Sequence, residues 1–192
     1  MTSNIKTMYR KLENDRVHQG DILKDFDIPF IISKPELSTE STKPPYSIII
    51  SQDCDLDGIS KINDSLNNKS EEELINGNKF LPSIIIAPLY EADEINQGNY
   101  LSDFGLQMDY KGSKNRTRWK DILKNNNPRY HYLKGFNKDE EGFIVDFKIF
   151  YSIPYEYIKY NLKEYYWASL NELYREDLSD RFFNYHSRIG LP

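Results

Sequence analysis

The chain has almost no cysteine. Cys54 is the single thiol among 192 residues, so no disulfide can form within the chain. Small secreted domains depend on several disulfides, and the sequence therefore does not fit that class. A lone thiol is typical of the reducing cytoplasm, where we expect this protein to be located.

Long hydrophobic runs are also missing. The longest, residues 48–50 and 84–87, are far shorter than the ~20 apolar residues of a membrane-spanning helix. Residues 1–16 are polar and lack the apolar centre of a signal peptide. We therefore expect no association with a membrane.

Histidine is scarce as well. The chain has only His18, His131 and His186, which lie far apart in the sequence. With a single cysteine, they form no ligand pair at the spacing that zinc sites use. The sequence therefore predicts no metal site, and no motif in it indicates a cofactor.

The rest of the composition is typical of a folded domain. Aromatic residues make up 14% of the chain and charged residues 29%, whereas disordered chains are poor in aromatics. The length suits one domain. We predict a polar lead-in over residues 1–16, a sheet or barrel with helical insertions over 17–151, and a C-terminal helical segment over 152–192.

Apolar patterning predicts the strands. They are expected at residues 17–24, 28–32, 46–51, 83–89, 130–133 and 142–151. The isoleucine triplets within 46–51 and 83–89 indicate burial on both faces, so these two strands should be central. Residues 34–45 are rich in Ser, Thr and Pro and predict a loop.

Helices are expected at residues 115–124, at a short segment that Ser70 opens, and at the C-terminus. There, Ser169 and Glu172 would form a capping box, and apolar residues recur at helical spacing up to Gly190. This last helix should be about 20 residues long. The predicted fold class is α+β, with a small curved sheet or SH3-like β-barrel, insertions, and a long C-terminal amphipathic helix.

Charge is unevenly distributed along the chain. The net charge is −5, yet residues 111–134 carry +7, which leaves −12 for the remainder. Cations interleaved with rings such as Trp119 favour nucleic-acid binding. The predicted binding residues are Arg116, Arg118, Lys120, Lys124 and Arg129. The alternative interpretation is a solvated helix face with Trp119 in the core.

A second candidate site follows the predicted strand 46–51. If that strand continues, Asp53 and Asp55 project to one side and Cys54 to the other. The two carboxyl groups would then divide acid and base roles or bind a cation, and Cys54 would be a nucleophile activated by His131. The alternative is that Asp53 caps a turn and Cys54 is buried.

Two family resemblances accompany these motifs. Gln19-Gly20-Asp21-Ile22, then Ser51-Gln52-Asp53, then Ile84-Ile85-Ile86-Ala87-Pro88-Leu89 resemble the start of the MazF/PemK toxins. That resemblance implies an SH3-like barrel and metal-independent RNA cleavage. In those toxins a basic residue just before the second strand serves cleavage, and here that place holds Pro44-Pro45-Tyr46. The resemblance therefore assigns no catalytic residue to this chain.

The second resemblance joins the two ends of the chain. Ser51-Gln52-x-Cys54-Asp55-Leu56, together with Arg181-Phe182 and the terminal Arg188-Ile189-Gly190-Leu191-Pro192, is similar to an uncharacterised bacterial protein family. This resemblance implies a bacterial protein and no particular activity.

Three functions remain open at this stage. The first is a bacterial defence or toxin–antitoxin-type protein that binds or cleaves RNA or DNA through the basic segment. The second is a non-catalytic adaptor with a protein partner from the same multi-component system. The third is a hydrolase that uses Asp53, Cys54 and Asp55 with His131.

Overall fold

The computed structural model describes residues 8–13, 16–33, 37–67, 77–102, 105–108, 116–137 and 141–187. The strands are β1 (Tyr9–Arg10), β2 (Asp21–Lys24), β3 (Ile28–Ser33), β4 (Leu37–Thr42), β5 (Tyr46–Ile49), β6 (Ser83–Glu91), β7 (Tyr130–Leu133), β8 (Phe143–Asp146), β9 (Tyr151–Pro154) and β10 (Tyr166–Leu170). The helices are α1 (Asp53–Asn67), α2 (Ala92–Gln97), α3 (Arg116–Leu123), α4 (Tyr155–Tyr165) and α5 (Glu172–His186), with a 3₁₀ turn, η1, at Gly77–Lys79. No helix in these ranges has the length and apolar character that crossing a membrane requires.

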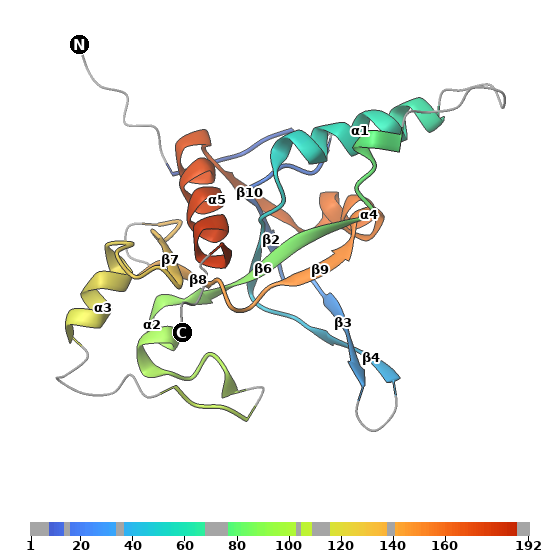
Figure 1. The fold of residues 1–192 in the computed structure, drawn as a ribbon. Helices are drawn as coiled ribbons and strands as arrows, with labels where there is room; N and C mark the ends of the chain where they lie inside the picture. Colours follow the sequence, from blue (N-terminus) through green and yellow to red (C-terminus); the bar gives the residue numbers. More distant parts are fainter. Residues whose placement is uncertain are drawn as a thin grey trace, which may run out of the picture.

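The main sheet is antiparallel and strongly curled, like half of a barrel (Figure 1). Its strand order is β1-β10-β2-β5-β6-β8-β7, and β9 pairs with the first half of β6. Strands β3 and β4 form a separate two-stranded ribbon. The α+β class and the curled sheet predicted from the sequence are therefore confirmed, and β5 and β6 are central as expected.

The two edges of the curled sheet approach each other. Tyr9 of β1 donates a hydrogen bond to the carbonyl of Lys134, just beyond β7. Its ring centroid lies 4.7 Å from that of Phe136. The free edge of β7 is occupied by Asn125, whose side chain bonds both the N–H (2.6 Å) and the carbonyl (3.1 Å) of Tyr132. The β7 edge is thus not a bare row of backbone groups.

Hydrophobic side chains cover both faces of the central strands. Because side chains alternate along a strand, Ile49 enters one core and Ile48 another. The first core is closed by α1 and α4, and the second by Leu178 and Phe182 of α5. A third core lies behind β7 and β8, where α2 and α3 pack.

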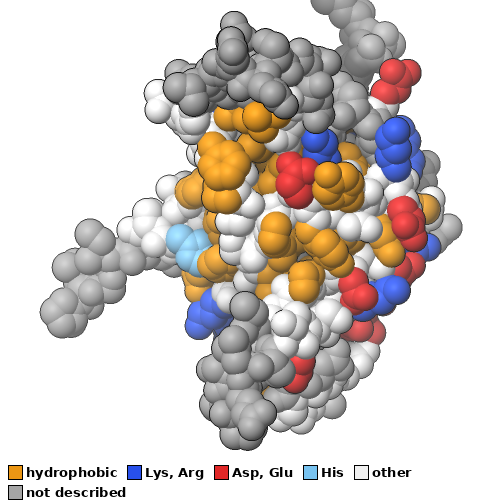
Figure 2. All heavy atoms as spheres, turned by 90° about the vertical axis from the view of Figure 1, so that its right-hand side faces the viewer, with side chains coloured by type: hydrophobic (Ala, Val, Ile, Leu, Met, Phe, Trp, Pro, Cys, Tyr) orange, Lys and Arg blue, Asp and Glu red, His pale blue; other side chains and the backbone are white. Residues whose placement is uncertain are grey.

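Part of the first core reaches the surface. Several hydrophobic side chains packed against it are only partly buried, namely Ile62, Leu81, Tyr151, Tyr157, Tyr165 and Tyr166. Figure 2 shows hydrophobic side chains gathered in the middle of the face seen from the right of Figure 1. Single exposed apolar residues are normal, so this surface alone assigns no function.

Two predictions for the first half of the chain are wrong. Residues 37–42 form β4 rather than a loop, because the β3–β4 ribbon lies outside the main sheet and does not need an apolar alternation. Residues 53–67 form α1, where the sequence suggested a strand end and a polar segment. The short helix predicted after Ser70 lies outside the described residues.

The C-terminal prediction needs correction as well. Ser169 is no helix cap but a buried residue of β10, which pairs with β1 and β2. The helix begins at Glu172, spans 15 residues, and leaves Leu173 66% exposed. The predicted strand 142–151 is divided into β8 and β9 by a turn that starts at Phe147.

Gly98 offers a test of the packing around α2. Its φ is +76°, and a Cβ there would collide with the carbonyl oxygen of Met108. We expect Gly98→Ala to lower the free energy of unfolding by about 3 kcal/mol in urea titrations. Gly105→Ala is the control, since φ is +68° but no atom lies within 4 Å of the added Cβ. It should cost only about 1 kcal/mol, and equal losses would contradict the collision.

Candidate functional site

Two polar motifs of the sequence, Gln19-Gly20-Asp21 before β2 and Asp53-Cys54-Asp55 after β5, meet at one end of β5. Strands β2 and β5 are antiparallel, with Ile22 opposite Ile48, and the Gly20 N–H bonds the Ile49 carbonyl at 2.9 Å. Residues that precede β2 therefore lie beside residues that follow β5. This register brings His18 next to Asp53.

Asp53 is the first residue of α1 and not the continuation of a strand. The N–H groups of Asp55 and Leu56 both bond the Gln52 carbonyl at 3.1 Å, which starts the helix. Consecutive helical residues turn by about 100°, so Asp53 and Asp55 do not share a side. Asp55 and Cys54 are exposed, and Leu56 is buried. The predicted pair of carboxyl groups is thus not formed.

The carboxylate of Asp53 is contacted by donors from two chain segments, residues 16–19 and α5. Arg16 donates from Nη1 to Oδ1 at 3.3 Å and from Nη2 to Oδ2 at 3.1 Å, and the Gln19 N–H donates at 3.2 Å. His18 Nδ1 lies 3.4 Å from Oδ1, and Arg175 Nη1 of α5 lies 3.5 Å from Oδ2. Burial alone would raise the pKa of Asp53, but hydrogen bonds from His18 and Arg16 hold it well below its usual range.

Asp21 is connected to the cluster around Asp53 through His18 and is fully buried. Its Oδ2 accepts the His18 N–H at 2.7 Å, and its Oδ1 accepts the Ser169 hydroxyl at 2.6 Å. Burial raises the pKa of Asp21 to about 6, although both hydrogen bonds act in the opposite direction. The two aspartates therefore differ in charge state in mildly acidic solution.

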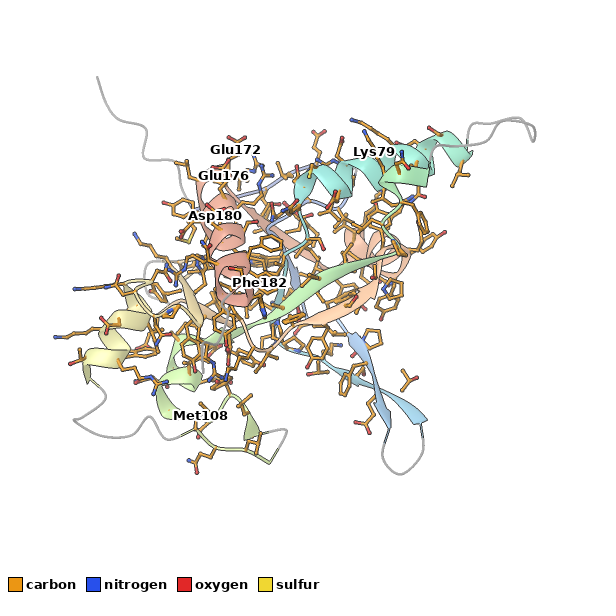
Figure 3. The ribbon with its side chains drawn as sticks, viewed as in Figure 1. Lys79, Met108, Glu172, Glu176, Asp180 and Phe182 are labelled. Carbon is orange, nitrogen blue, oxygen red and sulfur yellow. The ribbon has the colours of Figure 1, made fainter. Side chains whose placement is uncertain are left out.

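A cavity of about 440 Å³ adjoins Asp53, between the start of α1 and α5. It is lined by Gln19, Gln52, Asp53, Cys54, Glu176, Ser179 and Asp180. Figure 3 labels Glu172, Glu176 and Asp180 along α5. With carboxyl groups on both of its walls, the cavity suits a cationic or neutral polar group better than a phosphate.

Cys54 lines this cavity and is exposed. Its sulfur lies 3.7 Å from Gln52 Oε1 and 3.8 Å from Asp55 Oδ1. The buried position weighed in the sequence analysis is therefore wrong. Among the described residues, no histidine is hydrogen-bonded to Cys54.

His131, the predicted base, lies in β7 and is only 2% exposed. Its ring stacks on Phe147, its Nδ1 has no hydrogen-bond partner, and the nearest carboxylate oxygen, of Asp177, is 4.0 Å away. Burial and the Arg181 guanidinium lower the pKa of His131 to about 3. His131 is thus a neutral core residue, and the histidine beside Asp53 is His18, which sequence spacing alone did not single out.

The basic segment keeps only part of its predicted surface. Arg118, Lys120 and Lys124 are exposed, and the side chain of Arg116 lies outside the described residues. Arg129 is held by buried Asp146, with Nε 2.8 Å from Oδ1, and its Nη2 donates to Tyr100 at 3.1 Å. Removing Arg129 would leave a buried charge unpaired, so its role is structural.

Among the described residues, no group of three or more His, Cys, Asp or Glu side chains is arranged to hold a metal ion. The polar cluster around Asp53 is instead internally neutralised by arginine. The geometry of this cluster fits a structural role, in which the ion pairs of Asp53 hold residues 16–19 and α5 against the start of α1, better than it fits coordination of a metal ion.

The raised pKa of Asp21 predicts a pH effect. Above pH 3.8 the unfolded chain loses this proton, while the folded protein keeps it up to about pH 6. The contribution of Asp21 to the free energy of unfolding is therefore full below pH 3.8 and is lost as pH rises toward 6. Relative to wild type, Asp21→Asn should gain stability between pH 4 and pH 7 in urea titrations.

Asp53→Asn is the contrasting variant. Its low folded pKa gives stability that is present above the unfolded value and lost only below it. The difference between Asp53→Asn and wild type should thus be constant above about pH 5. A constant difference for Asp21→Asn over the same range would contradict the raised pKa.

Exposure of Cys54 is directly testable. We expect 5,5′-dithiobis(2-nitrobenzoate) to modify the folded protein stoichiometrically without denaturant, because the thiol is exposed. Cys54→Ser should abolish the reaction and change the free energy of unfolding by less than about 0.5 kcal/mol. Modification only in urea would show a buried thiol.

Neither protein families nor curated proteins provide a match. No family model matches the chain, and no curated protein matches it significantly. The two resemblances given above stay predictions.

Proposed function

We propose that the protein binds nucleic acid through the exposed cations at α3. The observation that carries this proposal is the division of α3 into two faces. Ile122 is fully buried in the third core and Trp119 packs against it, while Lys120 and Lys124 are exposed. The helix is therefore fixed by its apolar side and offers its cations to solvent.

The two lysines act as neighbours. The N–H of Lys124 bonds the carbonyl of Lys120 at 3.1 Å, which extends the helical pattern by one residue beyond α3. Residues four apart on a helix lie about 6 Å apart, close to the spacing of successive phosphates along a strand. Arg118 is also exposed, but at two residues from Lys120 it lies on a different side of the helix from the two lysines.

The binding surface is local, because the chain as a whole is acidic. A phosphate backbone would be attracted to α3 and repelled by the cavity beside Asp53. Binding without cleavage is proposed, since buried His131 does not reach a phosphodiester. A bacterial defence or toxin–antitoxin setting is supported only by the sequence resemblance.

The test is fluorescence anisotropy with fluorescein-labelled 20-nucleotide RNA and DNA at several salt concentrations. Wild type should bind with an affinity that falls as salt rises, and Lys120→Ala/Lys124→Ala should weaken binding at low salt by about tenfold. The salt slope should fall by about 1.4, because two phosphate contacts are lost and each contributes about 0.7 on a single strand.

Lys159→Ala/Lys163→Ala is the matched control. These lysines of α4 have the same spacing and the same charge, so general electrostatics change equally. The control should bind like wild type. Equal losses in both variants, or no binding by wild type at low salt, would refute the proposal.

A further inference from the structure

A second surface lies at the opposite end of β5 from Asp53. Five rings, which we call the aromatic groove, meet there: Tyr9, Tyr46, Phe136, Phe143 and Trp167. Tyr46 is central to it, with centroids 5.1 Å from Phe136, 5.2 Å from Phe143 and 6.1 Å from Trp167. All but Phe143 are only partly buried.

The rings continue the second core beyond the reach of α5. Leu178 and Phe182 of α5 cover the middle of this sheet face, and the groove lies where that cover ends. A β-bulge sets Trp167 apart, since Tyr166 pairs with Leu23 and Ala168 with Ile22. The bulge leaves Trp167 without a partner on β2. Bulges that redirect a side chain are frequent beside binding sites.

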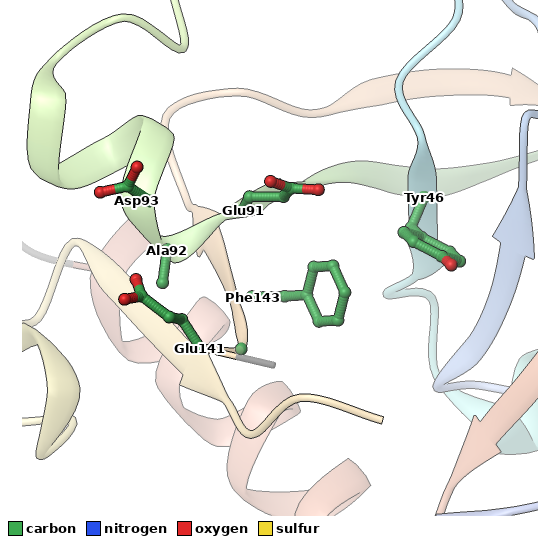
Figure 4. A pocket seen from close by; sticks show the side chains of 7 residues that line it. Tyr46, Glu91, Ala92, Asp93, Glu141 and Phe143 are labelled. Atoms are coloured by element: carbon green, nitrogen blue, oxygen red, sulfur yellow. The ribbon is translucent and has the colours of Figure 1, made fainter. Parts of the chain in front are cut away.

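One end of the groove opens into an acidic cavity of about 380 Å³. It is lined by Tyr46, Glu91, Ala92, Asp93, Glu141, Gly142 and Phe143. Figure 4 shows the Phe143 ring pointing toward Tyr46, with the Glu91 carboxyl group beside the space between them. Glu91 and Glu141 are exposed, and neither is paired with a basic residue in the described ranges.

The other end is basic. A cavity of about 240 Å³ there is lined by Tyr9, Arg10, Lys11, Phe136, Trp167 and Ala168. The Nζ atoms of Lys11 and Lys24 lie 4.7 Å and 5.1 Å from the Trp167 ring centroid. Arg10 also lies at this end, with its Nη1 4.0 Å from Glu172 Oε1. A ligand carboxylate would find the ammonium groups of Lys11 and Lys24 at this end.

We propose that the aromatic groove binds an extended segment of a partner protein, with a basic side chain in the acidic cavity and an acidic group at the basic end. The argument is charge complementarity along an apolar surface. A guanidinium or ammonium group in the acidic cavity would interact with the carboxylates of Glu91 and Glu141. It would also contact the ring faces of Tyr46 and Phe143. The rings supply apolar contact area between the two charged ends.

Single-stranded nucleic acid fits this groove less well. Bases would stack on the rings, and phosphates would pair with Lys11 and Lys24. The same strand would then bring phosphates to Glu91, Asp93 and Glu141, where like charges repel. The acidic cavity thus favours a peptide, and it separates this surface from the one proposed at α3.

The test begins with a phage-displayed random heptapeptide library selected on the full chain. We expect enriched peptides to share a Lys or Arg and, further along, an Asp or Glu. A fluorescein-labelled copy of the most enriched peptide then measures affinity by anisotropy. Glu91→Gln/Glu141→Gln keeps the cavity shape, removes its charge, and should weaken binding about tenfold.

The controls distinguish the two proposals. Glu40→Gln/Glu164→Gln removes two exposed acids from β4 and α4 and should bind the peptide like wild type, as should Lys120→Ala/Lys124→Ala. Lys11→Gln/Lys24→Gln should weaken the peptide and leave oligonucleotide binding unchanged. Absence of the charge pattern, or equal binding by Glu91→Gln/Glu141→Gln, would overturn the proposal. A third outcome would assign the groove to nucleic acid and also overturn the proposal. In it, Glu91→Gln/Glu141→Gln binds the oligonucleotide more tightly than wild type, and Lys11→Gln/Lys24→Gln binds the oligonucleotide more weakly.

Discussion

The central strands carry isoleucine on both faces, and the architecture follows from the need to cover both. Ile49 and Ile84 are covered by α1 and α4, while Ile48 and Ala87 face the side where α5 packs. A helix of 15 residues is about 22 Å long and cannot cover a whole curled sheet. Aromatic side chains complete the cover where α5 does not reach. This incomplete cover leaves aromatic side chains that pack against the second core and are also partly exposed.

The two ends of β5 differ in chemistry. One end leads into Asp53, where arginines from the N-terminal segment and from α5 meet a single carboxylate. This arrangement fixes α1 and α5 relative to the sheet. The other end holds Tyr46 between an acidic and a basic cavity. A protein that contacts nucleic acid at α3 and a partner segment at Tyr46, as proposed, would connect the two.

The sequence was informative where local pattern decides structure. Isoleucine triplets predicted β5 and β6, and the spacing of Trp119 and Ile122 predicted α3.

Prediction from the sequence failed where pairing between distant residues decides the structure. Ser169 precedes Glu172 as a cap would, yet its hydroxyl bonds Asp21, 148 residues away. Asp53 was recognised as a candidate, but its partners Arg16, His18 and Arg175 come together only through the β2–β5 register and the packing of α5. Arg129 looked like its basic neighbours because nothing local marks Asp146 as its partner.

The side chain of Asn125 has a consequence for how other chains can attach. It occupies the N–H and carbonyl of Tyr132, the groups that an incoming strand would need in order to extend the sheet at β7. Strand addition, and the uncontrolled aggregation that begins with it, is therefore blocked at that edge. Any partner must recognise side chains rather than backbone there, which makes selectivity a matter of charge and ring placement.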